Sequence, residues 1–496
     1  MKQEYLKLTK HTVIYGAGMM ISKVISFIML PIYTRYLTPA DYGTVELLTS
    51  TIDVISMIVG LGLTGTIFKY YYEYEDQTDR NEVISTAAIM MIGIALFTAV
   101  CGVLLSSRLS LLVFHHEQND GYFRIIFTIY FLQQGTLIIP FMFMRAVENS
   151  KLFVLINLIK LFVQVAFNIL FVVVFKMGIQ GVLISTLLAD SLIGLYLIAH
   201  TFRKVGFRFS FSKSMKMVKF GYPFIFVSLS SFVLTYSDRY FLNTFSDLKT
   251  VGIYALAYKF GFLMAYIAVA PFMQTWEPQR FEIAKQDNAL QIFNKVFLYF
   301  NIVVISLSLA IVLLVKDALA VMSGPAYHEA YKLVPIIITA YVFQAWTFFC
   351  NLGIYIQEHS NYMAIASLIS AVVVTILNYI LIPKYGAYGA AWATAGAFFI
   401  RFFLIYVLAQ KLYWIDYGWH KQLLLFLASI VIYLASTVIT SSRLIPSLGI
   451  NLFLFAFFEV MIYSFFLENP EKKIIADFIK KPQSILRVFQ GIRMRV

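Results

Sequence analysis

The chain has 496 residues, of which 60% are hydrophobic and 13% are charged, and its mean hydropathy is +0.78. A soluble domain of this size would need far more charge to cover its surface, so the composition excludes that class and indicates a multi-pass membrane protein. Cys101 and Cys350 lie far apart in apolar segments, and the seven histidines show no ligand spacing. We therefore expect no disulfide, no metal site and no cofactor.

The N-terminal stretch MKQEYLKLTKH leads directly into a long apolar segment without a small-residue cleavage site. The first helix is therefore expected to be retained. Segments long enough to cross a ~30 Å apolar layer then recur along the chain and predict an all-α polytopic fold with about 14 transmembrane helices. The expected spans are residues 12–33, 45–68, 83–106, 122–145, 153–175, 179–200, 217–243, 250–275, 293–315, 333–355, 362–382, 387–409, 422–440 and 447–467.

The basic residues predict the orientation of these helices. The N-terminus, alternate loops and the C-terminal tail carry 25 of the 39 lysines and arginines, the opposite loops carry 10, and 4 fall inside spans. The positive-inside rule then places both termini in the cytoplasm. The net charge of +13 thus comes mostly from basic residues in the loops and termini at the membrane surface. Nucleic acid is not an expected partner.

Two basic segments, residues 201–219 and 470–496, mix these cations with Phe, Ile, Leu and Met. This pattern is typical of segments that lie on a leaflet of anionic membrane lipids, and simple anchoring of the topology accounts for it. The predicted organisation is an N-terminal lobe, a basic amphipathic linker, a C-terminal lobe, two further helices and a basic tail, at residues 1–200, 201–219, 220–410, 411–468 and 469–496.

An internal repeat indicates how the helices are arranged. The segments KMGIQG (176–181) and KYGAYG (384–389) are 208 residues apart, and Gly43 and Gly252 are 209 apart. A period of this length covers six helices, an even number, so both copies have the same orientation. We expect two parallel six-helix lobes related by a pseudo-twofold axis along the membrane normal, with a substrate site between them, as in transporters.

Charges inside the predicted spans are candidates for the substrate site, because such residues usually face the interior of a bundle. Lys259 costs roughly 2.5–3.5 kcal/mol near the centre of a membrane helix. Its repeat-equivalent position is Ser50, one turn from Asp53. With Lys23 and Lys160, these residues predict a net-cationic cavity suited to a phosphate-bearing substrate. Lys259 would pair with Asp53 when the cavity is empty, although a pair that only joins helices explains the charges too.

Two other sets of charges have both structural and functional explanations. Asp190 and Arg401 lie in equivalent helices with opposite signs, and a pair that holds helices together is the simpler interpretation. Arg35, Asp238 and Arg239 are predicted at the outer ends of helices. They are either ordinary interface residues or charges of an outer gate.

Several segments carry a resemblance to a known family. These segments are TRYLTPADYGTVELL (34–48), KYYYEYEDQTDRNEVISTA (69–87), FGYPFIFVSLSSFVLTYSDRYFLNTF (220–245), VGIYALAYKFG (251–261) and QTWEPQRFE (274–282). They resemble the polysaccharide-biosynthesis export family, the Wzx-type flippases of the multidrug/oligosaccharidyl-lipid/polysaccharide exporter superfamily. The similarity covers the first twelve helices, whereas the last two and the tail match only in hydropathy.

The resemblance implies two lobes in a V shape, a cavity lined by helices 1, 2, 7 and 8, and alternating access. It implies a flippase without enzymatic activity in the bacterial cytoplasmic (inner) membrane. The substrate would be an oligosaccharide on undecaprenyl pyrophosphate, moved to the outer leaflet for O-antigen, capsule or exopolysaccharide assembly, where a polysaccharide polymerase would use it. Lys23 and Lys259 inherit the role of binding the pyrophosphate, and the scarcity of cavity arginines favours a surface-polysaccharide unit.

Other functions stay open at this point. A lipid II flippase or a multidrug antiporter of the same superfamily would share the fold, although cationic drugs call for acidic cavity residues. A membrane-embedded polymerase or glycosyltransferase would need a catalytic cluster in a sizeable loop, and the outer loops of about 20 residues show none. H⁺ or Na⁺ could drive transport through Asp53 or Asp190, or flux could run downhill, and the sequence has no nucleotide-binding P-loop.

Overall fold

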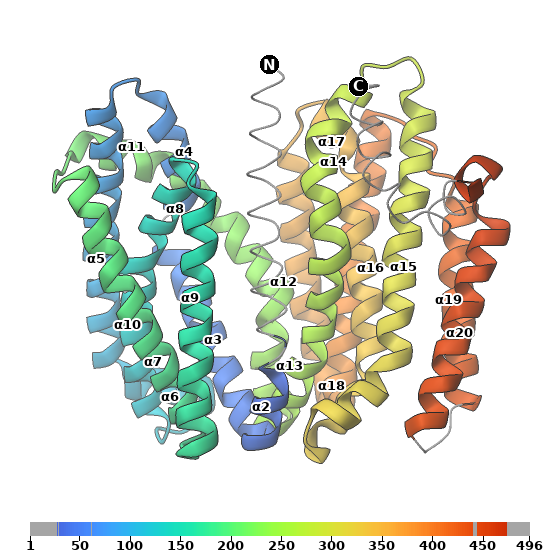
Figure 1. Cartoon of the computed structure of the whole chain (residues 1–496), viewed down its shortest axis with the longest axis horizontal. Helices are drawn as coiled ribbons and strands as arrows, with labels where there is room; N and C mark the ends of the chain where they lie inside the picture. The colour runs from blue at the N-terminus through green and yellow to red at the C-terminus, as the bar shows by residue number, and fades with distance from the viewer. Residues whose placement is uncertain (1–26, 28, 61, 440–443, 474–496) are drawn as a thin grey trace. The chain divides into compact units, whose positions relative to one another are not determined.

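The computed structural model describes residues 27–473 except residues 28, 61 and 440–443. Within these residues the chain forms helices and turns and no strand, and twelve helical stretches are long and apolar enough to cross a membrane (Figure 1). The predicted all-α polytopic fold is therefore confirmed. The predicted span 12–33 lies mostly outside the described residues, and the other thirteen fall on these twelve stretches, because one stretch contains two predicted spans.

The helical segments follow one another with short connections. They are α2 (Leu30–Tyr36), α3 (Pro39–Val59), α4 (Leu63–Glu73), α5 (Gln77–Leu104), α6 (Ser106–Phe114), α7 (Asp120–Leu132), η1 (Gln133–Leu137), α8 (Ile138–Ala146), α9 (Ser150–Asn168), η2 (Ile169–Val174), α10 (Gly178–Val205), α11 (Phe211–Gly221), α12 (Pro223–Phe245), α13 (Leu248–Met264), η3 (Ala265–Val269), α14 (Ala270–Ile283), α15 (Ala289–Met322), η4 (Pro325–Lys332), α16 (Val334–Cys350), α17 (Leu352–Ile356), α18 (Asn361–Leu412), α19 (Trp419–Ile439) and α20 (Leu444–Phe465).

The described helices group into two compact units. The first unit extends to Thr275 and resumes from Ala318 to Trp414. In it α5, α7, α9 and α10 pack on one another, α12, α13, α16 and α18 form a second group, and α3 contacts both α12 and α13. The second unit combines the stretch Trp276–Asp317 with the chain from Ile415 onward, so that the first part of α15 packs with α19 and α20.

The predicted repeat is visible in the backbone. Gly178 and Gly386, which are 208 residues apart, both have positive φ, at 57° and 52°. Each glycine follows a lysine by two positions and begins the second helix of its pair. Glycine adopts a positive φ without the penalty of a side chain, so both copies of the repeat place a glycine at the equivalent turn position.

The same two turns bring helices together tightly. A Cβ atom on Gly389 would lie 2.4 Å from the carbonyl oxygen of Leu381, and one on Gly181 would lie 3.0 Å from that of Phe171. Gly386 therefore divides α18 into two halves that turn back on each other. The predicted spans 362–382 and 387–409 are these two halves.

The predicted linker 201–219 is largely helical. α10 continues to Val205, and α11 occupies Phe211–Gly221. The Lys213 ammonium lies 2.8 Å from an Asp79 carboxylate oxygen and 2.6 Å from one of Glu82, so it joins α11 to the start of α5. Burying a lysine in this way requires such partners, and this cation is therefore not free to meet lipid.

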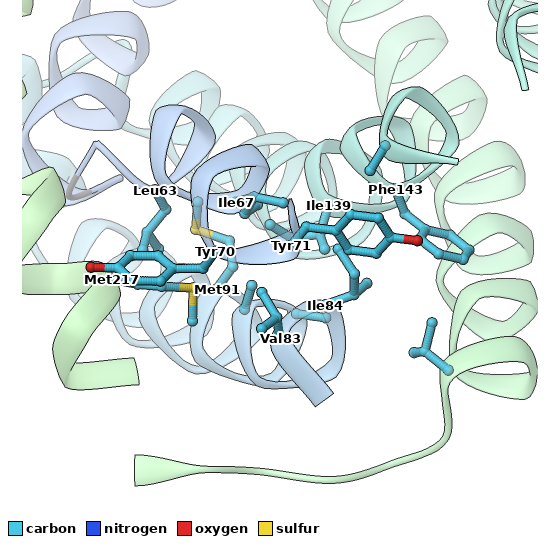
Figure 2. Packing of buried hydrophobic residues seen from close by; sticks show 14 residues of the cluster. Leu63, Ile67, Tyr70, Tyr71, Val83, Ile84, Met91, Ile139, Phe143 and Met217 are labelled. Carbon is cyan, nitrogen blue, oxygen red and sulfur yellow. The ribbon is translucent and has the colours of Figure 1, made fainter. Parts of the chain in front are cut away.

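A hydrophobic cluster lies beneath this linker. Figure 2 shows Met217 of α11 beside Tyr70 of α4 and Met91 of α5, and the Tyr70 hydroxyl donates to the Lys216 carbonyl at 3.1 Å. All three side chains are at most 9% exposed. The N-terminal helices are thus held at this end by a packed core as well as by the Lys213 ion pairs.

Candidate functional site

The candidate site is built where α3 and α13 cross. At this crossing the repeat-related glycines Gly43 and Gly252 face each other's helix. A Cβ atom on Gly43 would lie 2.1 Å from the Leu248 carbonyl oxygen, and one on Gly252 would lie 1.9 Å from that of Pro39. Because neither glycine has a side chain, the two backbones touch, and charged residues further along both helices come within reach of each other.

Glu46 is the centre of a charged cluster at this crossing. Its carboxylate lies 3.7 Å from the Lys259 Nζ atom of α13 and 3.2 Å from the Arg239 Nε atom of α12. Arg239 also places Nη1 2.7 Å from an Asp238 carboxylate oxygen. Two cations and two anions therefore balance, with Glu46 shared between both cations.

Arg239 is locked into this cluster. It is fully buried, at 0% exposure, and Nη1 donates to the Thr235 carbonyl at 2.7 Å. Three tyrosine rings surround the guanidinium, with ring centroids within 5.7 Å, and they belong to Tyr236, Tyr254 and Tyr258. Cation–π contacts of this kind strengthen when water is excluded, so Arg239 is a fixed structural cation.

Lys259 has a different environment. Its side chain is 38% exposed and its only close carboxylate in the described part of the chain is the one at 3.7 Å on Glu46. Lys259 also lines a cavity of about 370 Å³. The ammonium is therefore held loosely and is accessible to a molecule in that cavity.

The cavity walls come from α2, α3, α9, α12, α13 and η3, and most of them are aromatic or aliphatic. The rings belong to Phe27, Tyr33, Tyr42, Tyr236, Phe262 and Tyr266. Gln164 and Asn168 of α9 add two amides. A cavity with apolar walls, a few amides and hydroxyls and one charge is typical of a small-molecule or headgroup site.

The structure corrects the predicted pairing of Lys259. Its ion-pair partner is Glu46, and Asp53 has no cation within 4 Å among the described residues. Asp53 lies two turns beyond Glu46 on α3, roughly 10 Å along the helix axis, and Glu46 is the carboxylate nearest to Lys259 in the described structure. The predicted cavity residue Lys23 lies outside the described residues.

The predicted pairing of Asp190 with Arg401 is also wrong. Asp190 of α10 pairs with Lys160 of α9 at 2.7 Å and accepts a hydrogen bond from Gln133 at 2.8 Å. Lys160 is therefore committed to a helix contact and is not among the described residues that line the cavity. The Arg401 Nε atom is buried without a hydrogen-bond partner in the described structure.

The predicted interface charges divide into two kinds. Asp238 and Arg239 are 1% and 0% exposed, so they are not ordinary interface residues. Arg35 is exposed, and its Nη2 atom donates to the Val321 carbonyl at 3.0 Å. A gating role for these three residues stays a proposal.

Glu46 was not predicted from the sequence. It lies in DYGTVELL, one turn after Gly43. The surrounding segment is mostly apolar and was interpreted as part of a membrane helix, so the single charge of Glu46 did not mark it as a site residue. The repeat-related glycine Gly43 could have indicated Glu46, because a backbone contact at Gly43 places the residue one turn later against the facing helix. The described residues contain no group of three His, Cys, Asp or Glu side chains that could hold a metal ion.

Solved structures show which fold this chain shares. A lipid II flippase MurJ in an inward closed conformation has a TM-score of 0.71 at 14% identity, covering 91% of this chain and 99% of that one. An inward-facing multidrug resistance MATE family transporter of the MOP superfamily has a TM-score of 0.62 at 13% identity, covering 78% and 94%. At these identities the likeness shows the fold alone.

Sequence comparisons show the family. The "Lsg locus putative protein 1" of Haemophilus influenzae is 31% identical over 81 residues, and the match spans 16% of this chain and 20% of that protein's length. Residues 8–284 match the family described as "Polysaccharide biosynthesis protein", which is more than half of the chain. The resemblance predicted from the sequence is confirmed. The chain therefore belongs to the polysaccharide biosynthesis protein family, within a fold shared by MurJ and MATE transporters.

Proposed function

We propose that this protein is a flippase that moves an undecaprenyl-pyrophosphate-linked oligosaccharide from the cytoplasmic to the outer leaflet, by alternating access, for surface polysaccharide assembly. The observation that carries the proposal is Lys259, an accessible ammonium on the wall of a largely apolar cavity of about 370 Å³. Both termini would be cytoplasmic in a bacterial inner membrane, and a polysaccharide polymerase would receive the product.

The charges of the cavity favour an anionic substrate. Lys259 is the one charged residue among the described residues that line it. A pyrophosphate carries more negative charge than the Glu46 carboxylate, which Lys259 shares with Arg239. The pyrophosphate could therefore displace Glu46 from the ammonium, which binds phosphate as a point charge.

The rings and amides of the cavity favour a headgroup with sugars. Tyrosine and phenylalanine rings offer flat apolar faces for the sugar ring. The Gln164 amide nitrogen donates to Thr186 at 3.2 Å, and its amide oxygen can accept a hydrogen bond from a hydroxyl. A cationic drug would meet an ammonium here, which disfavours the multidrug alternative. Lipid II shares the pyrophosphate carrier, and the family description is what favours a polysaccharide unit over it.

The test is the amount and leaflet of undecaprenyl-linked oligosaccharide in cells that lack the gene. We expect the intermediate to accumulate on the cytoplasmic face, wild-type protein to clear it, and Lys259→Ala at matched expression to fail. Lys259→Arg should clear part of it, because the cation is kept while its shape changes. Lys249→Ala, an exposed lysine on the same helix α13, is the matched control and should behave as wild type.

Three results would contradict parts of the proposal. Normal clearance by Lys259→Ala, with accumulation in the deletion, would leave the flippase function intact and make Lys259 a structural partner of Glu46. No accumulation in cells without a second flippase would mean that the substrate is wrong. Accumulation of lipid II in the same cells would favour the peptidoglycan precursor.

A further inference from the structure

The hydroxyls of two tyrosines that line the Lys259 cavity have no role so far in the proposed function. They belong to Tyr33 of α2 and Tyr42 of α3. Tyr42 and Glu46 are four positions apart, so they are neighbours on the face of α3 that contacts Lys259 of α13. Tyr42 and Glu46 are also the two groups that interact most strongly with the Lys259 ammonium. The Tyr42 hydroxyl is therefore a close neighbour of that cation.

The position of Tyr42 is fixed by its surroundings. The capping box between Thr38 and Asp41 sets the first turn of α3, with 2.9 Å between the Thr38 backbone nitrogen and an Asp41 carboxylate oxygen. The Tyr42 ring packs edge-on against Tyr327, with 6.1 Å between ring centroids, and the Tyr327 hydroxyl donates to the Leu37 carbonyl at 3.1 Å. The ring that carries the Tyr42 hydroxyl is thus held in place before a ligand enters, which lowers the entropic cost of binding.

Tyr33 is oriented by an amide of α9. The Asn168 side chain forms a hydrogen bond with the Tyr33 hydroxyl, and the Asn168 Oδ1 atom is buried without a hydrogen-bond partner. The amide nitrogen is therefore the donor and the phenol oxygen the acceptor, so the phenol proton stays available to the cavity. Tyr33 also interacts with both Tyr42 and Lys259. The two hydroxyls and the ammonium thus form one polar cluster on a largely apolar wall.

Two other buried tyrosines use their hydroxyls for structure. The hydroxyls of Tyr70 and Tyr327 each donate to a backbone carbonyl at 3.1 Å. Within the described part of the chain, no backbone carbonyl accepts a hydrogen bond from Tyr33 or Tyr42, and both residues line the cavity instead. When no ligand is bound, the Tyr42 oxygen can accept a hydrogen bond from the Lys259 ammonium. When an anion approaches Lys259, the same hydroxyl can turn its proton toward the anion.

We propose that Tyr33 and Tyr42 donate hydrogen bonds to the phosphate oxygens of the substrate and complete an anion subsite around Lys259. This inference rests on the proposed function, because it assumes that the cavity receives a phosphate-bearing lipid. A pyrophosphate has several acceptor oxygens, so it can contact one ammonium and two hydroxyls at once. Neutral donors strengthen the contact without adding positive charge, so the substrate stays able to leave the site.

The experiment measures binding of farnesyl pyrophosphate to the purified full-length protein by titration calorimetry. Farnesyl pyrophosphate carries the pyrophosphate on a short isoprenoid chain, and farnesol is the same chain without phosphate. We expect the wild type to bind the pyrophosphate and not farnesol. Tyr33→Phe and Tyr42→Phe keep the ring and remove one donor, so each should raise Kd about tenfold, as expected for the loss of one hydrogen bond to a charged group.

Tyr240→Phe is the matched control for the two tyrosine variants. Tyr240 lies on α12, its hydroxyl forms a hydrogen bond with that of Thr51 at 3.0 Å, and it is not among the described residues that line the cavity. Tyr240→Phe should therefore bind farnesyl pyrophosphate with the Kd of the wild type. Lys259→Ala should lose binding, which would show that the probe occupies the cavity with the lysine.

The outcomes separate this inference from the proposed function. Wild-type Kd values for Tyr33→Phe and Tyr42→Phe, together with lost binding by Lys259→Ala, would overturn the inference and leave the proposed function standing. Weaker binding by both tyrosine variants would support the anion subsite even where the deletion cells accumulate no lipid-linked oligosaccharide, and the proposed substrate alone would then be wrong. A wild type that does not bind farnesyl pyrophosphate would overturn the inference, and accumulation in the deletion cells would decide the proposed function separately.

Discussion

Replacement of Arg239 by methionine is expected to destabilise the folded protein by about 3–5 kcal/mol, the usual cost of removing one partner of a buried ion pair. Asp238 is 1% exposed, and Arg239 at 2.7 Å is its cation. The substitution also removes the centre around which Tyr254 and Tyr258 pack. The measurement is the midpoint of unfolding of the purified protein in a titration with a denaturing detergent.

Arg401→Met is the matched control for this prediction. Arg401 is also an arginine within a membrane-spanning helix, but it forms no ion pair among the described residues and its Nε atom is unsatisfied. Removing a buried group without partners relieves a desolvation cost, so Arg401→Met should be neutral or stabilising. Equal destabilisation by both substitutions would mean that packing, and not charge compensation, accounts for the loss at Arg239.

The fold was predictable because the sequence features that indicate it, apolar segments and repeated glycine turns, are local or periodic. Apolar segments of about 20 residues predict membrane helices directly. The turns at Gly178 and Gly386 repeat because the same positive φ is needed at the same place in each lobe. The predicted span 45–68 was wrong because of one glycine. Gly62 has a positive φ of 62°, so the predicted span 45–68 becomes two helices, α3 and α4.

The pairing of charges was less predictable, because it depends on helix rotation and on contacts between distant segments. Lys259 was placed on the correct helix, but the facing residue of α3 is Glu46 and not Asp53. Asp190 pairs with Lys160 of the preceding helix α9. Sequential helices joined by a tight turn, such as the one at Gly178, lie next to each other. Asp190 of α10 therefore lies closer to Lys160 of α9 than to a charge on a helix distant in the sequence.

The two cations near Glu46 have separate roles in this arrangement. Arg239 is buried and held at 2.7 Å by Asp238, whereas Lys259 is partly exposed and lies at 3.7 Å from its carboxylate. The phosphate of the proposed substrate would compete for the second contact far more readily than for the first. Arg239 would then keep Glu46 compensated when Lys259 leaves it, which avoids an uncompensated buried charge during transport.

Substitution of Gly43 or Gly252 by alanine is expected to disrupt the crossing that positions this cluster. A methyl group at either position would lie 2.1 Å or 1.9 Å from a carbonyl oxygen of the facing helix. Backbone atoms cannot rotate away as a side chain can, so α3 and α13 must move apart. Overpacking of this kind costs typically 1–3 kcal/mol, and more when a backbone must move.

The separation should also abolish transport, because Glu46 and Lys259 lie on the two helices that move apart. Gly93→Ala is the matched control, since a Cβ atom at Gly93 of α5 meets no atom within 4 Å. It should be neutral or slightly stabilising, as alanine is favoured over glycine in a helix. Thermal unfolding and clearance of the lipid-linked intermediate are measured for all three variants. A Gly43→Ala protein with wild-type stability and transport would show that α3 and α13 need not touch for the site to form.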